Sequence, residues 1–448
     1  MRSVLIVVLM VLATGASADD VPADSVARSA PDSLAPTSSV PWNPPHAMSP
    51  RSPWEQVVLF PGRLVSLPLS GLGYVARSSM LYVEDTGRLP IGPQVAHSRA
   101  PRIVAFQFPR LGDQPGPAAA VLARTPSSIR FIPFASARYA ASLHSYNSTL
   151  VGASGGPVSL QYGYDWRPRQ QFYGVGISSR RENATDYASQ GEFVRGALRW
   201  GLGGDSTGVG QRLQLSAWGG PRSQVTRTGR GPGQTSYEVL FPELGAATLD
   251  RRVEHLIYGG SVLADWRSGR PHWSRGGRVL IGAERYDVPI RALALHSSQF
   301  SGAQFTRYSV ETETGVSIMR DPRTVRLLLR LSDEAVGAGQ DRLLISDMSR
   351  LGGHDGLGGY PPGRFHDLDL VLSRLMYVFP LERAFEVEIH AEWGAVYPDV
   401  WRDAKIRTLK HSVGFSLRGR TNAAPRGAVG FDFSPEGMRF NFALGGVE

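Results

Sequence analysis

The segment from Phe385 to Tyr397 alternates between apolar and polar side chains, and this alternation constrains the fold more than any other feature of the chain. In a β-strand, successive side chains point to opposite faces of the sheet. One face of the segment would therefore carry Phe, Val, Ile, Ala, Trp and Ala, and the other would carry Glu, Glu, His and Glu. Such a strand fits a soluble β-sandwich or the wall of a transmembrane β-barrel.

The same alternation recurs along the chain, and its recurrence favours the barrel. Residues 158–166 place Val, Leu, Tyr, Tyr and Trp on one face, and residues 325–331 place Val and three Leu on one face. Long alternating strands with aromatic ends are typical of transmembrane β-barrels. Further strands of this kind are predicted at residues 193–202, 211–218, 257–266, 278–286, 310–319, 411–417, 428–433 and 438–444.

Chain length sets the expected size of the barrel. Alternating segments separated by turn clusters begin near residue 129, so we place the barrel at residues 129–448. About 320 residues, at about 10 per strand plus loops, leave room for roughly 14 to 18 strands. We therefore predict an all-β fold, a transmembrane antiparallel β-barrel of about 16 strands.

Three segments precede the predicted barrel. Residues 1–18 contain Arg2, then a short apolar run, then an Ala-Ser-Ala cleavage site. This combination predicts a secretory signal peptide. Residues 19–53 are rich in Ala, Ser and Pro and are predicted to be a disordered leader. Residues 54–128 are broken by prolines and are expected to form a short periplasmic or plug segment. No later apolar run reaches the about 20 residues of a membrane helix, so we expect a barrel in the bacterial outer membrane.

Composition restricts the chemistry of the chain. It has no cysteine, which argues against a disulfide framework and against thiolate catalysis in an exported protein. Its net charge is +9, but the basic residues are scattered singly and form no nucleic-acid-binding block. We expect outer-membrane lipid as a partner and no nucleic acid. The oligomeric state is left open.

Two sequence patterns suggest a hydrolase as a less favoured alternative. Residues 204–208 match the Gly-x-Ser-x-Gly elbow of serine hydrolases, but a strand and not a helix is predicted to follow, which favours a hairpin turn. A barrel phospholipase would instead need a Ser and a His on its outer wall, and no spacing singles out His255, His272 or His411. We predict that the protein is not an enzyme.

Acidic and histidine residues raise the question of a metal site. Glu386, Glu388, His390 and Glu392 share one face and could bind a divalent cation or act as acid and base. A polar lumen wall balanced by Arg374, Arg407 and Arg418 is the favoured interpretation. A second set matches no ligand motif and is interpreted as solvated loop, so no metal or other cofactor is predicted; its members are His354, Asp355, Asp367 and Asp369.

Several segments between residues 150 and 448 resemble the outer-membrane barrels of the BamA and TamA type, also called bacterial surface antigens. Residues 351–365, Leu-Gly-Gly-His-Asp-Gly-Leu-Gly-Gly-Tyr-Pro-Pro-Gly-Arg-Phe, are similar to the family's Leu-Gly-Gly, Leu-Arg-Gly-Tyr and Gly-Arg-Phe signature. Glu392-Trp393-Gly394 stands where the family has Asp-x-Gly. The other similar segments are residues 172–176, 377–381 and 414–418.

The resemblance implies a long extracellular loop folded into the lumen and a part in outer-membrane biogenesis through a weak seam between first and last strands. It implies positioning roles for Gly359, Tyr360, Arg364 and Phe365 in the loop. On the facing strand it implies such roles for Glu392 and Gly394. Client outer-membrane proteins or periplasmic chaperones would be the partners. A passive pore or structural barrel is the alternative, with lumen charge setting ion selectivity.

Three departures from the family pattern are visible. The family's loop Arg falls at Gly358, so the contact with the acidic residue at Glu392 is expected to have lost its cation. The chain ends on Gly-Gly-Val-Glu and not on an aromatic residue, and Phe442 is the nearest candidate for that signal. No periplasmic POTRA repeat is recognised before residue 129, so a barrel-only member is expected.

Overall fold

The structure is a computed structural model, and the chain divides into two compact units, Met1–Leu72 and Gly73–Glu448. All residues whose placement is described lie in the second unit. The structure describes residues 105–107, 118–124, 134–142, 145–202, 213–229, 235–244, 249–267, 273, 275–289, 293–296, 303–318, 323–337, 344–353, 356–381, 385–419 and 427–444.

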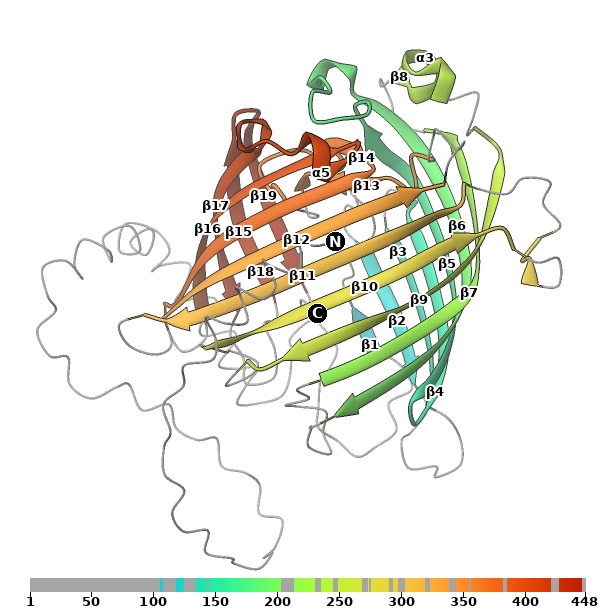
Figure 1. Cartoon of the computed structure of the whole chain (residues 1–448), viewed down its shortest axis with the longest axis horizontal. Coiled ribbons are helices and arrows are strands. Elements are labelled where there is room, and N and C mark those ends of the chain that lie inside the picture. The colour runs from blue at the N-terminus through green and yellow to red at the C-terminus, as the bar shows by residue number, and fades with distance from the viewer. Residues whose placement is uncertain are drawn as a thin grey trace, which may run out of the picture. The chain divides into compact units, whose positions relative to one another are not determined.

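These residues form a curled antiparallel sheet of 16 strands, in which most strands pair with their neighbours along the chain (Figure 1). The strands are β1 (Ala105–Gln107), β2 (Ala118–Arg124), β3 (Phe134–Ser142), β4 (Asn147–Gly155), β5 (Val158–Phe172), β6 (Thr185–Leu202), β7 (Leu213–Thr228), β9 (Arg252–Asp265), β10 (Gly276–Asp287), β11 (Phe305–Ser317), β12 (Thr324–Val336), β15 (Asp369–Pro380), β16 (Phe385–Tyr397), β17 (Lys410–Gly419), β18 (Gly427–Ser434) and β19 (Gly437–Leu444).

Short elements lie at one end of this sheet. β8 (Thr235–Ser236) runs parallel to the start of β6, and β13 (Ser349–Leu351) pairs with β14 (Phe365–Asp367) as a separate hairpin. The helical turns are η1 (Arg181–Asn183), α3 (Tyr237–Leu240), α5 (Val400–Asp403) and η4 (Ile406–Thr408). No helix among the described residues combines the length and apolar composition needed to cross a membrane.

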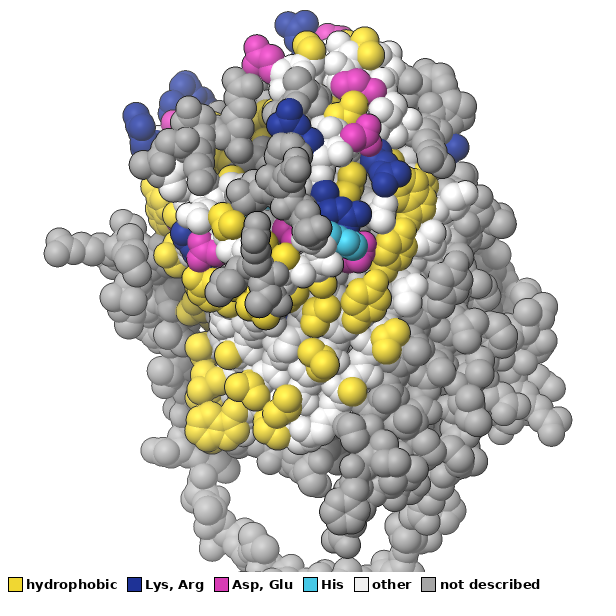
Figure 2. Space-filling model, turned by 90° about the vertical axis from the view of Figure 1, so that its right-hand side faces the viewer, with side chains coloured by type: hydrophobic (Ala, Val, Ile, Leu, Met, Phe, Trp, Pro, Cys, Tyr) yellow, Lys and Arg dark blue, Asp and Glu magenta, His cyan; other side chains and the backbone are white. Residues whose placement is uncertain are grey.

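The strand register places apolar side chains in continuous rows on the outer face of the sheet. One row runs across six strands, from β7 to β15, through directly opposed residues. Large apolar side chains on this face are exposed, and Figure 2 shows such side chains gathered below a region of charged ones on one side of the sheet. This is the distribution expected of a lipid-facing surface. The row is Leu215, Val262, Ile281, Val310, Leu331 and Val371.

The opposite, inner face carries the charged side chains. On β16, Glu388, His390 and Glu392 are buried on this face, while Trp393 is exposed on the outer face. The alternation predicted for residues 385–397 is therefore confirmed, and β16 has the predicted bounds. The other predicted strands also lie within observed strands or overlap them, and the prediction of 16 strands is confirmed.

Strand length falls toward both ends of the sheet. β6 has 18 residues and β7 has 16, whereas β18 and β19 have 8 each and β1 has 3. No pairing joins β1 to β19 among the residues that the structure describes, so the sheet is not closed. Two strands, β1 and β2, lie before residue 129, where the sequence placed the start of the barrel. The predicted signal peptide (1–18), the leader (19–53) and much of residues 54–128 lie outside the described residues.

Candidate functional site: a loop folded against the inner wall

The candidate site is built around the long connection between β12 and β15, of which residues 344–353 and 356–368 are described; we call it the lumenal loop. Its β13–β14 hairpin opposes Arg350 to His366. A short parallel bridge joins Val175 to His366, and the Gly176 N–H donates to the His366 carbonyl at 2.7 Å. The loop is thus joined by backbone hydrogen bonds to the β5–β6 connection as well.

Apolar side chains of the lumenal loop are buried against the inner face of β15 and β16. Leu351, Leu357, Tyr360 and Phe365 are each at most 2% exposed. The wall residues that they contact lie on the same face as Glu392, because Leu372 opposes Gly394 and Leu370 opposes Val396 in the register. Two predicted site residues, Tyr360 and Phe365, therefore belong to this apolar cluster, and their rings meet edge to face at 5.3 Å. The wall members are Leu370, Leu372 and Val396.

Glycines at two predicted site positions allow the close approach of loop and wall. A Cβ at Gly359 would lie 2.7 Å from the Phe433 backbone carbon on β18, and the Ser434 hydroxyl donates to the Gly359 carbonyl at 2.8 Å. A Cβ at Gly394 would lie 2.8 Å from the Leu351 side chain and 3.0 Å from the Val371 carbonyl oxygen. Any larger residue at either position would push the loop away from the wall.

Arg364 holds the lumenal loop to two other segments at the same end of the sheet. Its guanidinium, 4% exposed, lies 2.9 Å from the Glu436 carboxylate in the β18–β19 turn. It also donates to the Ser179 hydroxyl at 2.7 Å and to the Ser179 carbonyl at 2.8 Å, in the β5–β6 connection. Its planar fork stacks within 5.0 Å of the Tyr173 ring. A buried guanidinium with this many acceptors is geometrically specific.

Glu392 contacts the loop in a different way from the one the sequence suggested. The Gly358 backbone N–H donates to its carboxylate at 2.6 Å, and the Ser412 hydroxyl donates to the same oxygen at 2.7 Å. The cation is supplied from the wall, since Arg374 on β15 lies 3.5 Å from Glu392. As expected, position 358 of the loop carries no cation. The backbone N–H of Gly358 contacts the Glu392 carboxylate instead.

A second contact crosses β17 and reaches the terminal hairpin. His390 on β16 and Asp432 on β18 both oppose Gly414 in the register, and their side chains meet across this glycine at 2.6 Å, Nε2 to Oδ1. A Cβ at Gly414 would lie 2.7 Å from His390 Nε2 and would overlap Asp432 Oδ1. Asn441 on β19 donates to the other Asp432 oxygen. Both members of the pair are buried, so the contact connects β16, β18 and β19 away from water.

Two of the three arginines predicted to balance the acidic face do so. Glu388, fully buried, lies 3.0 Å from Arg374 and 2.7 Å from Arg418. Arg407 does not take part, because it lies on exposed η4 outside the lumen. The sequence could not separate it from the others because it falls in a connection whose direction is set only by packing.

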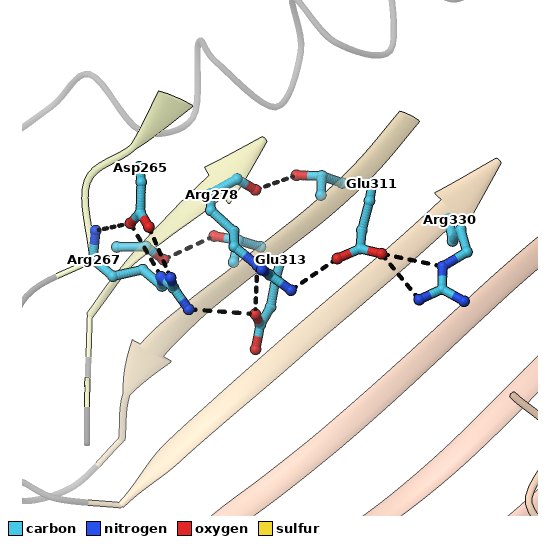
Figure 3. A network of polar contacts seen from close by, with 9 residues as sticks. Asp265, Arg267, Arg278, Glu311, Glu313 and Arg330 are labelled. Carbon is cyan, nitrogen blue, oxygen red and sulfur yellow. Dashed lines mark hydrogen bonds and ion pairs between the residues drawn. The ribbon is translucent and has the colours of Figure 1, made fainter. Parts of the chain in front are cut away.

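Further along the inner face, charged side chains of β10, β11, β12 and the β9–β10 connection form a ladder (Figure 3). Arg278 on β10 lies 2.8 Å from Glu311 and 3.1 Å from Glu313, both on β11. Glu311 is also 3.0 Å from Arg330 on β12, and Arg267 is 3.8 Å from Glu313. Nearly every charge in this ladder has two partners.

Burial changes the protonation of side chains in the lumenal loop. His366 is fully buried, and desolvation lowers its pKa to about 3, with the charge of Arg350 acting in the same direction and a backbone hydrogen bond to Gly363 opposing them. Burial also raises the pKa of the Asp367 carboxyl, against a hydrogen bond from the Leu368 N–H. The loop is therefore seated with His366 neutral.

The described histidines considered for hydrolase chemistry lie on opposite faces of the sheet. His255 lies on the inner face, where its Nε2 is 3.1 Å from the Ala303 carbonyl, and His411 is exposed on the outer face of β17. His272, His354, Asp355 and the 204–208 motif lie outside the described residues. Within the part of the chain that is described, no three His, Asp or Glu side chains are grouped as metal ligands.

Sequence reasoning missed four residues of the site, namely Ser179, Gly414, Asp432 and Glu436. Each is a common residue in a turn or a short strand, and each acts through a partner more than 15 residues away in the sequence. Of these four residues, only Asp432 could have been found from the sequence, because the alternation of β18 places it on the polar face.

Comparison with solved structures identifies the type of fold. The sequence matches no protein-family model and no curated protein. The crystal structure of BamA from Haemophilus ducreyi lacking POTRA domains 1–3 is 10% identical, with a TM-score of 0.52 over 75% of this chain and 68% of that one.

CdiB from Acinetobacter baumannii gives a TM-score of 0.42 at 10% identity, covering 76% of this chain and 57% of that one. CdiB from Escherichia coli gives 0.47 at 12% identity, covering 76% and 60%. This chain thus spans less than two thirds of either CdiB structure. The likeness to BamA concerns the fold, and on that ground the chain has a barrel of the kind seen in BamA.

Proposed function

We propose that the protein is a non-catalytic barrel of the bacterial outer membrane that assists the insertion or translocation of other proteins. The proposal rests on the end of the sheet: among the described residues β19 pairs only with β18, so it forms an edge, and the lumenal loop is hydrogen-bonded to this β18–β19 hairpin. Unpaired strand edges accept extended chains by main-chain hydrogen bonding. Client outer-membrane proteins, delivered with or without periplasmic chaperones, would be the partners.

The fold supports this proposal in two further ways. The loop packs its apolar side chains on the inner wall and therefore occupies space that a passive pore would keep open to water. Hydrogen bonds from Ser434 and Arg364 connect the loop with the β18–β19 hairpin. A movement of the loop would therefore also move the hairpin that forms the edge of the sheet. Gly359, Tyr360, Arg364, Phe365, Glu392 and Gly394 would act in this arrangement by positioning the loop.

Photo-crosslinking at the edge tests the proposal. A photoreactive phenylalanine analogue replaces Phe440 on β19, which is 58% exposed on the outer face, and the purified chain in lipid vesicles is given an unfolded outer-membrane protein. The matched control carries the same analogue at Trp200, which is 59% exposed on β6. We expect adducts from position 440 and none from position 200. Equal labelling at both positions would contradict entry of client strands at this edge.

Single-channel conductance separates the proposal from the passive pore. The intact protein and a variant lacking residues 351–364 are compared in planar bilayers. We expect a closed intact protein and an open variant, because the loop covers the inner wall. Steady conductance of the intact protein, together with an absence of adducts at position 440, would favour the pore.

A further inference from the structure

The connection between β16 and β17, residues 398–409, folds outward over the sheet; we call it the outer flap. Val400 and Leu409 pack against Ala395, Tyr397 and Val371, which lie on the outer, apolar face of β15 and β16. Ala395 is fully buried by this packing although it faces away from the lumen. The flap thus takes a position on the wall that lipid would otherwise occupy.

Three polar contacts fix the outer flap in this place. The Val400 N–H donates to Asp369 at 2.8 Å at the start of β15, and the Trp401 indole N–H donates to Asp333 on β12 at 3.2 Å. At the end of β16, the Tyr397 hydroxyl lies 2.8 Å from the Thr408 hydroxyl of the flap. Asp333 lies on the outer face two residues beyond Leu331, a member of the lipid-facing row. The flap therefore lies at the edge of the apolar row, and its cluster includes the row members Leu331 and Val371.

The exposed side of the outer flap combines apolar and basic side chains. Trp401 is 52% exposed and Ile406 is 89% exposed. Arg402, Lys405 and Arg407 are exposed beside them. Of the two acidic residues, Asp403 is exposed, whereas Asp399 accepts hydrogen bonds from the Trp401 and Arg402 N–H groups. A Trp with neighbouring Lys and Arg is the combination found where a protein meets lipid headgroups.

The position of the flap identifies which headgroups it would meet. It lies at the end of the sheet that holds the lumenal loop and the longest connections, with α5 beside β13 and β14 at the top of Figure 1. In outer-membrane barrels the long loops are extracellular. The outer-leaflet headgroups at this level are anionic where they carry phosphate, which matches the three cations.

We infer that the outer flap binds phosphate-bearing headgroups of the outer leaflet, with Trp401 and Ile406 entering the headgroup region and Arg402, Lys405 and Arg407 contacting phosphate. The inference rests on the outer-membrane location proposed above and is independent of any client protein. Bound lipid would hold the flap against β12, β15 and β16 and would orient this side of the barrel in the bilayer.

A single label tests the inference directly, because the chain has no native cysteine. Ile406→Cys in the full chain carries a nitroxide, and its accessibility to a water-soluble paramagnetic reagent is compared between vesicles of phosphatidylcholine and vesicles that also contain phosphatidic acid. We expect the label to be shielded in the second composition. Added salt should reverse the shielding, since electrostatic attraction to the surface is screened within about 10 Å at 0.1 M.

Charge variants show whether the flap itself is responsible. Replacing Arg402, Lys405 and Arg407 together by Gln should abolish the shielding, with about a five-fold loss of partitioning for each cation removed. The control is Arg180→Gln, an exposed cation on the β5–β6 connection at the same end, and it should leave the shielding unchanged. Heat-modifiable migration on gels verifies that each variant is inserted and folded.

The outcomes separate this inference from the proposed function. A chain that inserts but leaves the label water-accessible in both compositions overturns the inference, and so does equal shielding in both. Displacement of the label by millimolar inorganic phosphate alone would show a free-phosphate site and would also overturn lipid binding. A chain that fails to insert at all would contradict the membrane location, whatever its flap binds.

Discussion

The wall from β9 to β12 and the terminal hairpin β18–β19 are held in contrasting ways. In the wall, strands of 12 to 14 residues carry a ladder in which Glu311 contacts both Arg278 and Arg330. The hairpin has strands of 8 residues, and on its inner face the buried His390–Asp432 contact connects it to β16. The wall can lose one ion pair and keep its strand register, because nearly every charge in the ladder has a second partner. The hairpin depends on a few buried polar contacts.

The hairpin is the part of the sheet that we expect to separate most easily. Backbone pairing scales with strand length, so the hairpin has fewer hydrogen bonds to oppose separation. The lumenal loop also contacts the hairpin, through the Arg364–Glu436 ion pair and the hydrogen bond from Ser434 to the Gly359 carbonyl.

Replacing Arg364 by Ala should have the largest effect. It leaves Glu436 and the Ser179 carbonyl without their buried donor, and breaking a buried ion pair costs about 3–5 kcal/mol. We expect faster proteolysis of the lumenal loop and a lower urea midpoint in vesicles. Arg364→Lys should recover only part of the loss, because an ammonium cannot reproduce the fork. Full recovery by Lys would argue that charge alone matters.

Gly414→Ala should separate the hairpin from β16. The added Cβ would overlap Asp432 Oδ1 and approach His390 Nε2, so the buried pair must move apart at a cost of about 2–4 kcal/mol. Urea unfolding in vesicles measures the loss. Gly196→Ala is the control, since its Cβ would meet only a carbonyl oxygen at 3.7 Å. Equal effects of the two variants would show that the His390 contact does not support the hairpin.

Acid should loosen the lumenal loop through His366. Its pKa is lowered to about 3 by burial, from an ordinary 6.5, so seating is fully favoured above pH 6.5 and is progressively lost as the pH falls toward 3. At pH 5 the loss is about 2 kcal/mol. Protease sensitivity of the loop against pH measures it. His366→Phe should make the protease sensitivity of the loop nearly independent of pH between pH 6.5 and 4. If the pH dependence is unchanged in this variant, another group causes it.

Arg278→Gln should have the smallest effect, at most about 1 kcal/mol, because the side chain is 33% exposed and its partners keep Arg330 and Arg267. Urea unfolding in vesicles again provides the measurement. The double variant Arg278→Gln with Arg330→Gln should lose more than the sum of the two single changes, since Glu311 would then lack both cations. A large loss from Arg278→Gln alone would remove the contrast between wall and hairpin.

The fold was predictable because one face of each strand meets lipid and the other meets the lumen, so apolar and polar side chains alternate along the strand. Residues 385–397 were predicted as a strand with the bounds that β16 has, since each side chain there has one acceptable environment. The strands before residue 129 were harder to recognise, because β1 and β2 are short and prolines surround them. Of the candidate site, the loop position at Gly359, Tyr360 and Phe365 came from the family resemblance, and the structure places these residues on the inner wall.

The strand pattern, the face on which each side chain lies and the polar character of the lumen depend on local alternation, and all three could be predicted from the sequence. The partners of the buried polar side chains are visible only in the folded chain. Arg364 reaches Glu436, Asp432 reaches His390 across a glycine, and Arg407 leaves the lumen for the outer flap. Such contacts join residues far apart in the chain, and they depend on strand register and loop direction, which packing alone fixes.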